Sequence, residues 1–175
     1  MPFDDTYLLS LLDELEFKTH TIEHAPLRTV EEAKELRGEI SGGHVKNLFL
    51  KDKKGRHLLV VALENTKIDL KGLAKLMETP KLSFASQEEL YEYLGIRPGA
   101  VSPFAIVNDI DCNVTVVLDA LLEKEECLNF HPLRNDRTTN ISTNDFLKFL
   151  DVQKHKPIIV NFEAMVVEEG QIICN

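Results

Sequence analysis

Four short segments of the chain carry residue types that could bind or transform a polar substrate. Each lies at the end of an expected strand, where a rigid scaffold commonly presents functional groups. We therefore consider them together as parts of a candidate site. The segments are His24 with Pro26, residues 42–47, residues 95–104 and residues 129–132.

The segment Gly42-Gly43-His44-Val45-Lys46-Asn47 combines backbone freedom with polar side chains. Its two glycines allow another backbone or a ligand to approach closely. The apolar run that follows predicts a buried strand. Lys46 supplies a cation, and Asn47 supplies amide donors and an acceptor, so the pair could hold a phosphate and a polar substrate group. The alternative is that Lys46 is an ordinary solvated lysine at a strand end.

His131 is the best single candidate for proton transfer or for a hydrogen bond to a substrate. An unperturbed histidine has a pKa of about 6.5, close to working pH. The alternative is a structural histidine bonded to the backbone. Residues 99–103, Gly-Ala-Val-Ser-Pro, could present backbone N–H groups to a carbonyl oxygen or oxyanion. They could equally form an ordinary proline-bounded loop, and Ser102 lacks the Gly-x-Ser-x-Gly setting of a nucleophile.

The remaining reactive side chains favour structural roles. Asp109 and Asp111 precede an apolar run, so we interpret them as turn formers and not as an acid/base pair. The three cysteines, Cys112, Cys127 and Cys174, are odd in number and widely spaced. They indicate neither a disulfide scaffold nor a zinc site. Cys127 is expected in the core, and the compartment is expected to be the reducing cytoplasm.

Charge is unevenly distributed along the 175 residues, whose net charge is -9. That balance argues against bulk binding to nucleic acid. A local basic strip suits a partner that touches one place, although a lysine-rich turn kept soluble is the alternative. No apolar run approaches the roughly 20 residues that cross a bilayer, and the acidic N-terminus lacks a signal-peptide layout. The strip holds Lys46, Lys51, Lys53, Lys54 and Arg56 against Asp52 alone.

Hydrophobic periodicity and capping residues predict an α/β or α+β domain over residues 1–175, built around a mixed sheet. Signatures of dinucleotide-binding and P-loop folds are absent. Helices are expected over 4–16, 29–37 with a stop at Gly38, 70–77, 86–95 and from 142 or 143, with a helical turn at 120–126. Strands are expected over 18–23, 45–51, 57–63, 81–85, 105–108, 114–118, 126–131 and 157–162.

These motifs, in this order and spacing, resemble the prolyl-tRNA editing domain family, also called YbaK/ProX. The similarity is densest over residues 43–52 and continues through 95–104, which contains the Gly-x-x-x-Pro loop typical of the family. It closes over 129–135 and Thr138, and it spans roughly residues 5–162. The resemblance implies a mixed sheet or partial barrel surrounded by helices.

The resemblance also implies an activity. Members hydrolyse the ester between a wrong amino acid and tRNA, either within prolyl-tRNA synthetase or as separate proteins. This chain is most similar to the free-standing ProX group, which clears alanine from tRNA for proline. Action on Cys-tRNA or Ser-tRNA, and a non-catalytic module that binds tRNA or a synthetase, stay open. The implied partners are the aminoacylated 3′ end and acceptor stem of tRNA, with prolyl-tRNA synthetase as a further candidate; no metal, cofactor or membrane is implied.

Family roles carry over to matching positions. Lys46 corresponds to the lysine that engages the 3′-terminal nucleotide, Asn47 to its polar neighbour, and His131 to the histidine that helps hold the aminoacyl group. The loop over 99–103 corresponds to the one facing the scissile ester. The expected catalytic residues are Lys46, Asn47, Gly99, Pro103 and His131; the expected substrate or tRNA contacts are His24, Pro26, His44, Lys51, Lys81, Ala100, Val101, Ser102 and Asn129.

Overall fold

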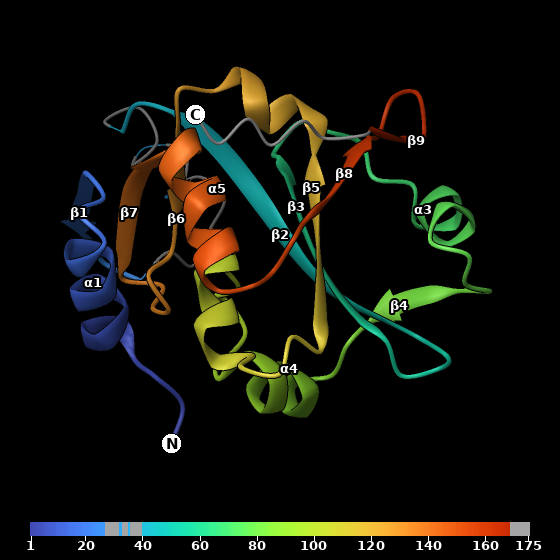
Figure 1. Cartoon of the computed structure of the whole chain (residues 1–175), viewed down its shortest axis with the longest axis horizontal. Helices are drawn as coiled ribbons and strands as arrows, with labels where there is room; N and C mark the ends of the chain where they lie inside the picture. The colour runs from blue at the N-terminus through green and yellow to red at the C-terminus, as the bar shows by residue number, and fades with distance from the viewer. Residues whose placement is uncertain (27–31, 33–34, 36–39, 169–175) are drawn as a thin grey trace.

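The computed structural model describes residues 1–26, 32, 35 and 40–168 (Figure 1). The helix expected over 29–37 and its stop at Gly38 lie outside the described residues, apart from Glu32 and Glu35. No helix in the described part is both long enough and apolar enough to cross a membrane.

The described elements form a mixed α/β architecture, as the sequence predicts. The helices are α1 (Asp5–Glu14), α3 (Leu70–Leu76), α4 (Gln87–Leu94) and α5 (Thr143–Val152), with 3-10 helices η1 (Pro103–Asn108) and η2 (Ala120–Lys124). The strands are β1 (Thr19–Glu23), β2 (Gly43–Asp52), β3 (His57–Leu63), β4 (Leu82–Phe84), β5 (Val114–Asp119), β6 (Cys127–Phe130), β7 (Arg137–Ser142), β8 (Ile158–Asn161) and β9 (Val166–Glu168).

The described strands form one nine-stranded mixed sheet in the order β1-β7-β6-β2-β3-β5-β8-β9, with β4 also paired to β2. The β2–β6, β3–β5 and β5–β8 pairs are parallel, and the other pairs are antiparallel. No ladder joins β1 to β9 among these strands, so the sheet stays open at its two edges.

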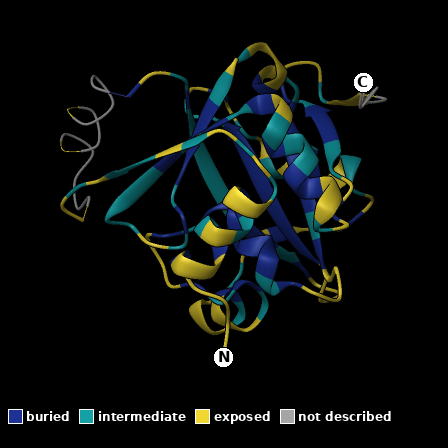
Figure 2. Ribbon diagram, turned by 60° about the vertical axis from the view of Figure 1, so that its left-hand side comes forward, coloured by how far each residue is buried: buried dark blue, intermediate teal, exposed yellow. Residues whose placement is uncertain are grey.

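Apolar side chains pack on both faces of this sheet, because buried strands present residues to both sides. Helices α1, α4 and α5 with η1 cover one face, where the Phe104 ring makes edge contacts with Phe130 and Phe149 at 5.3 Å. Helix α3 covers the other face through Leu73 and Ala74. Figure 2 shows the resulting buried centre between the helices. Removing one such ring, as in Phe104→Ala, costs about 3–5 kcal/mol.

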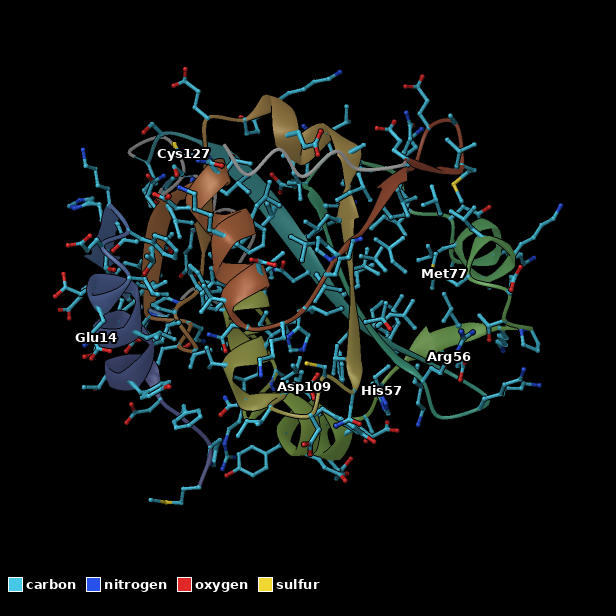
Figure 3. The ribbon with its side chains drawn as sticks, viewed as in Figure 1. Glu14, Arg56, His57, Met77, Asp109 and Cys127 are labelled. Atoms are coloured by element: carbon cyan, nitrogen blue, oxygen red, sulfur yellow. The ribbon has the colours of Figure 1, made fainter. Side chains whose placement is uncertain are left out.

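The turn between β2 and β3 is organised by one buried carboxylate. Asp52 accepts hydrogen bonds from the backbone N–H of Lys54 at 2.7 Å and from Arg56 Nε at 2.7 Å. The Arg56 guanidinium, opposed by burial, holds the pKa of Asp52 well below its usual range. Arg56 Nη2 also donates to the Met77 carbonyl at 3.0 Å, which ties the turn to the end of α3 (Figure 3).

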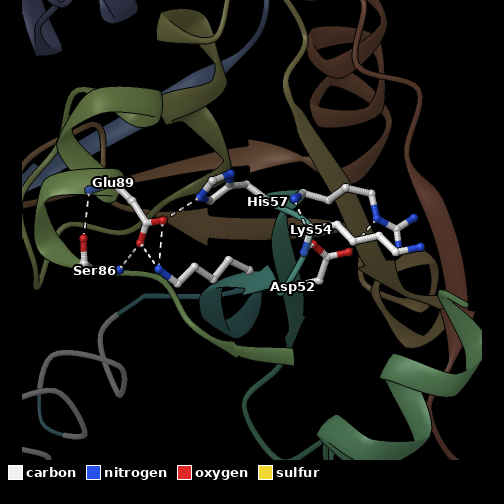
Figure 4. Close-up of polar contacts among 7 residues, drawn as sticks. Asp52, Lys54, His57, Ser86 and Glu89 are labelled. Atoms are coloured by element: carbon white, nitrogen blue, oxygen red, sulfur yellow. Dashed lines mark hydrogen bonds and ion pairs between the residues drawn. The ribbon is translucent and has the colours of Figure 1, made fainter. Parts of the chain in front are cut away.

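Helix α4 begins at a capping box and is anchored to the hairpin by the same glutamate. Ser86 Oγ accepts from the Glu89 N–H, and Glu89 accepts from the Ser86 N–H. The Glu89 carboxylate also lies 2.8 Å from Lys51 Nζ and 3.3 Å from His57 Nε2 (Figure 4). Chiefly through Lys51, this environment lowers the pKa of Glu89 to about 2. Gly95, with φ of 65°, then ends the helix.

Three sequence predictions differ from the structure, one of them the strand β9 (Val166–Glu168), for which no strand was expected. Residues 105–108, expected as a central strand, belong to η1, because Ser102 Oγ caps Phe104 N–H at 3.2 Å and Pro103 occupies the first turn. A short apolar run does not distinguish a strand from a buried helix. Strand β7 was not predicted, since Thr138 and Asn140 alternate with the buried Thr139 and weaken its apolar signal.

The turn before β5 depends on Asp109, which confirms its interpretation as a turn former. Its carboxylate accepts from the N–H groups of Asn113 at 2.9 Å and Val114 at 2.7 Å. His155 Nε2 lies 2.9 Å from Asp109 Oδ2, and both side chains are buried. Burial acts to raise the pKa of Asp109, but the hydrogen bonds from His155 and Val114 outweigh it and lower that pKa.

We predict that Asp109→Ala lowers the free energy of unfolding by about 3 kcal/mol at pH 7, because it leaves a buried partner unpaired. The folded-state pKa of Asp109 lies below its unfolded value. Its contribution is therefore complete above the unfolded value, about 3.9, and is lost as pH falls through the folded value. Urea unfolding from pH 7 to pH 2 measures the difference. Exposed Asp111→Ala is the matched control, expected within about 0.5 kcal/mol; an equal loss in both variants would contradict the assignment.

Candidate functional site

One face of the β1-β7-β6-β2 portion of the sheet carries a row of polar side chains. His44 pairs with Asn129, Asn129 with Asn140, and Asn140 with His20. Directly opposed residues on neighbouring strands point to the same face. The row therefore forms a polar surface on the side of β6 opposite the buried Phe130.

Strands β2 and β6 part directly beyond this row. Their ladder ends at the His44–Asn129 pair within the described strands. Because side chains alternate along a strand, residues two positions further on return to the same face. Lys46 is such a residue in β2. His131 follows the end of β6 and lies beside His24, whose ring bonds Thr138 of β7, next but one to Asn140 of the polar row.

Asn129 fixes the start of β2 against β6. Its buried Nδ2 donates to the Ser41 carbonyl at 2.9 Å, and its Oδ1 accepts from Asn140 Nδ2 at 2.9 Å. Gly42 has φ of 102°, and a Cβ there would lie 2.8 Å from the Cys127 carbonyl oxygen. Only glycine tolerates that combination. The sequence predicts that a backbone or a ligand approaches this turn closely, and the backbone of β6 does so at Cys127.

Lys46 is held by a chain of uncharged groups that leads to a buried carboxylate. Its ammonium donates to the Thr66 carbonyl, and the Thr66 hydroxyl donates to Asp119 Oδ2. Asp119 also accepts from the Leu63 N–H at 3.2 Å. No carboxylate pairs with Lys46 among the described residues, so its positive charge is available to an anion.

A hollow of about 390 Å³ opens between the start of β2, the end of β3 and η2, and Thr66, which holds Lys46, is part of its lining. It is large enough for a small polar ligand group. Its lining joins the polar row to the support of Lys46, because it includes both His44 and Thr66. The other lining residues are Gly42, Gly43, Leu63, Glu64, Asn65, Leu121 and Glu125.

Asn47 points to the opposite face from Lys46 and holds the predicted loop. Its Nδ2 donates to the Val101 carbonyl at 3.0 Å. Its Oδ1 is buried and has no hydrogen-bond partner among the described residues. Buried acceptors are nearly always paired in folded proteins. The Asn47 side chain is therefore both a support for the loop and an acceptor that a bound molecule could use.

The loop over 99–103 lies between β2 and the segment after β6. Gly99 has φ of 92°, and a Cβ there would lie 3.7 Å from Asn135 Nδ2. The Ala100 N–H donates to the Arg97 carbonyl at 3.2 Å. Within the described chain, no acceptor pairs with the N–H groups of Gly99, Val101 or Ser102. Ser102 is fully buried, so the N–H groups of Gly99 and Val101 are the ones that stay predicted donors to an oxyanion.

Ser102 and Pro103 anchor the C-terminal end of this loop. Ser102 is fully buried and its Oγ is engaged as the cap of η1, which agrees with the absence of a nucleophile motif. Pro103 is also buried and occupies the first turn of η1. A proline at that position needs no hydrogen-bond partner and fixes the helix start. The end of the loop is thus anchored in the core.

His131 has a defined tautomer. Its Nδ1 lies 2.8 Å from the Arg137 carbonyl oxygen, which can only accept, so Nδ1 carries the proton. Burial lowers the pKa of His131, outweighing the opposing effect of the Arg137 carbonyl, and the neighbouring His24 lowers it further. The ring is therefore neutral at pH 7, with the lone pair on Nε2.

His24 lies beside His131, with the ring centroids 6.4 Å apart. Its Nδ1 is 2.8 Å from the Ala25 carbonyl, so its Nε2 accepts from the Thr138 hydroxyl at 2.9 Å when the ring is neutral. Thr138 and Arg137 belong to β7, the strand that the periodicity did not reveal. Pro26 follows on the exposed surface.

Two predicted contacts lie outside this cluster. Lys51 is at the far end of β2 from Lys46, where both Glu89 oxygens neutralise it at 2.9 and 2.8 Å. Lys81 is exposed before β4. The residues that sequence reasoning missed are Thr66 and Asp119, which support Lys46; Thr138, named in the family motif, was given no role and bonds His24. For Asp119, the sequence signal that could have indicated a role in the site was a polar residue at the end of an apolar strand.

The described residues provide an ammonium and a neutral imidazole lone pair, and, on the other face of β2, an unpaired amide oxygen and backbone donors of the loop over 99–103. Such groups suit a substrate that has an anionic part, a hydrogen-bond donor and a carbonyl to be polarised. No grouping of three or more His, Cys, Asp or Glu side chains that could bind a metal occurs in the described residues.

Comparison with known proteins gives this cluster a context. Residues 24–149 match a sequence profile described as the aminoacyl-tRNA editing domain. The chain is 44% identical over 144 residues to a protein of Acetoanaerobium sticklandii named prolyl-tRNA editing protein ProX, covering 82% of this chain and 88% of the relative. It is 37% identical over 158 residues to prolyl-tRNA synthetase associated domain-containing protein 1 of Danio rerio, covering 89% and 86%.

A solved structure has the same fold. It is described as the crystal structure of a candidate trans-editing enzyme for prolyl tRNA synthetase, and it matches with a TM-score of 0.66 at 20% identity. The match covers 97% of this chain and 100% of that chain. The mixed sheet with its surrounding helices is therefore the fold that the motifs predict.

We predict that His131 titrates below about 6.5, the value of an unperturbed histidine, because burial disfavours the imidazolium. At pH 7 the ring should show the Nδ1–H tautomer, since the Arg137 carbonyl accepts from Nδ1. Nitrogen-resolved NMR titration measures both properties. His131→Asn identifies the signal by its loss. An Nε2–H tautomer, or a midpoint above 6.5, would show that the ring is held differently.

Proposed function

The chain belongs to the aminoacyl-tRNA editing domain family, and on that premise we propose that it clears alanine from tRNA for proline. It is an aminoacyl-tRNA hydrolase, and its partner is charged tRNA. We propose that residues 1–175 act as one editing domain in the cytoplasm, with prolyl-tRNA synthetase as a further candidate partner. The relative named prolyl-tRNA editing protein ProX supports the choice of tRNA.

The observation that carries the proposal is the position of Lys46 and His131, each two residues beyond the last β2–β6 pair, His44–Asn129. Lys46 has no carboxylate partner in the described structure, so its ammonium can bind a phosphate of the 3′-terminal nucleotide. His131 is neutral with an acceptor at Nε2. That nitrogen can accept a hydrogen bond from the α-ammonium of the aminoacyl group. The two residues together fix both ends of the scissile ester.

The loop over 99–103 supplies the remaining requirement for ester hydrolysis. Water adds to the carbonyl carbon, negative charge develops on the carbonyl oxygen, and the bond to the ribose oxygen breaks, releasing alanine and tRNA. Backbone N–H donors aimed at that oxygen stabilise the transition state, each by about 3 kcal/mol. Asn47 holds the loop in position through Val101. The vicinal ribose hydroxyl of the tRNA is the group we assign to orienting the water.

Selection of alanine over proline has to rest mainly on steric exclusion. One methylene in an apolar pocket changes binding by only about 1–3 kcal/mol, so attraction alone discriminates weakly. A pocket that admits a methyl group and rejects a ring achieves more. Cysteine and serine side chains are close to alanine in size, and Cys-tRNA and Ser-tRNA are therefore the substrates to be compared with it.

We predict that the protein deacylates Ala-tRNA faster than Pro-tRNA, Cys-tRNA or Ser-tRNA, and that Lys46→Ala reduces kcat/KM by about 100-fold or more. Release of labelled amino acid from each charged tRNA is the measurement. Lys156→Ala removes an exposed lysine before β8 and is the matched control. An undiminished rate in Lys46→Ala would show that Lys46 has no role in the reaction. Faster release of cysteine or serine would mean that Cys-tRNA or Ser-tRNA is the preferred substrate. Binding of tRNA without turnover would identify a non-catalytic module.

We predict that Asn47→Ala lowers kcat about tenfold or more with a smaller change in KM. The variant releases the Val101 carbonyl and lets the loop move from its position beside the ester. Steady-state kinetics with Ala-tRNA separate the two constants. The melting temperature is the control for folding, because the lost hydrogen bond should cost only about 1 kcal/mol. A change confined to KM would mean that Asn47 contributes binding and does not position the loop.

A further inference from the structure

The carbonyl that fixes the tautomer of His131 lies at an end of β7 that is paired on one side. Arg137 is the first residue of this strand, and its carbonyl oxygen lies 2.8 Å from His131 Nδ1. The ladder between β6 and β7 ends at the Phe130–Thr139 pair in the described strands, so Arg137 lies beyond it. Its neighbour in the sheet is Glu23 of β1, which is an edge strand. Such strand ends open more readily than the centre of a sheet.

The side chain of Arg137 joins this end of β7 to two other elements. Its Nη1 donates to Asp5 Oδ2 at 2.9 Å, and its Nη2 lies 2.9 Å from Glu23 Oε1. The Asp5 side chain is 12% exposed, whereas the Glu23 side chain is 75% exposed. Because water screens exposed ion pairs, the link to Asp5 is the stronger of the two. Asp5 begins α1, which Figure 1 shows beside β1 and β7.

Asp5 is itself held in place by the residues that precede it. Asp4 caps the first turn of α1, and the Phe3 N–H donates to Asn108 Oδ1 at 2.7 Å. Asn108 is the last residue of η1, the helix that begins at the end of the loop over 99–103. The N-terminal segment therefore connects η1, which follows that loop, to the start of β7.

The segment between β6 and β7 depends on such anchors. Leu133 has φ of 65°, a left-handed conformation that residues with a side chain adopt only where their surroundings impose it. Arg134 Nε lies 3.9 Å from Asp5 Oδ2, but it donates to Asp136 Oδ1 at 2.9 Å, so its closer partner lies within the same segment. The pair of Asp5 with Arg137 is thus the closer of the two links between this segment and α1.

We propose that Asp5 is a positioning residue for His131: by pairing with Arg137 it keeps the Arg137 carbonyl at His131 Nδ1 and so presents Nε2 to the aminoacyl group. The inference rests on the proposed function only for what Nε2 contacts. Without the ion pair, the end of β7 opens and the ring loses the acceptor that orients its proton. The proton then distributes between the two nitrogens, and a ring protonated at Nε2 cannot accept a hydrogen bond from an α-ammonium group.

The test compares Asp5→Ala, which removes both acceptor oxygens, with Asp5→Asn, which keeps one. Nitrogen-resolved NMR at pH 7 reports the tautomer of His131, and release of alanine from Ala-tRNA gives kcat/KM. In Asp5→Ala we expect a mixture of Nδ1–H and Nε2–H tautomers and a kcat/KM about tenfold lower, because a displaced group no longer meets the substrate correctly. Asp5→Asn should give intermediate values of both, since its amide oxygen still accepts from Arg137.

Asp4→Asn is the matched control, because it removes one negative charge from the same end of α1 while asparagine retains the cap. Its His131 tautomer and its kcat/KM should equal those of the unaltered protein. Equal changes in Asp4→Asn and Asp5→Ala would overturn the inference, and so would a shifted tautomer with undiminished hydrolysis.

The melting temperature distinguishes positioning from a purely structural role. A lower melting temperature of Asp5→Ala with an unchanged tautomer of His131 would overturn the inference. If Asp5→Ala does not fold, the tautomer in Asp5→Asn decides in its place. If the unaltered protein does not hydrolyse Ala-tRNA, the proposed function fails, and the tautomer still decides whether Asp5 positions His131.

Discussion

Side-chain alternation along β2 is the constraint on which the rest of the structure depends. This ten-residue strand pairs with β3 along one edge and with β6 and then β4 along the other. One of its faces carries Val45 and Phe49 into the core beneath α1, α4 and α5. The other carries Leu48 and Leu50 against α3. Lys46 and Asn47 must then point to opposite faces, where they have different partners.

Because Lys46 and Asn47 point to opposite faces of β2, they have different roles in the site. Lys46 is held by the Thr66 carbonyl, which is itself fixed through the buried Asp119. Asn47 holds the Val101 carbonyl and so connects the loop to the same strand. The charged group and the backbone donors are thus positioned by one rigid element. Their relative placement does not depend on a flexible side chain spanning the site.

Most elements could be predicted because their ends carry local signals. The capping box of Ser86 and Glu89 and the apolar run of β3 depend only on nearby residues, and both are confirmed. The expected strand over 105–108 was wrong because its apolar run also fits a buried 3-10 helix capped by Ser102. Local pattern alone does not decide between those two structures.

The parts of the site that could not be predicted depend on contacts distant in sequence. Strand β7 escaped notice because Thr138 and Asn140 face the polar row, which removes the apolar signal. The supports of Lys46 come from Thr66 and Asp119, and no pattern in the chain links those positions before folding. The tautomer of His131 likewise depends on the Arg137 carbonyl. The residues were identifiable by type, whereas their protonation and orientation required the fold.

Alternation along β2 also restricts how this protein can change in evolution. A single residue inserted or deleted between Lys46 and Asp52 would turn every later side chain of the strand to the other face. Leu50 would leave the contact with Leu73 on α3, and the turn would lose its placement beside that helix. Length variation in this stretch is therefore tolerable only in steps of two residues, or where a β-bulge absorbs the extra residue.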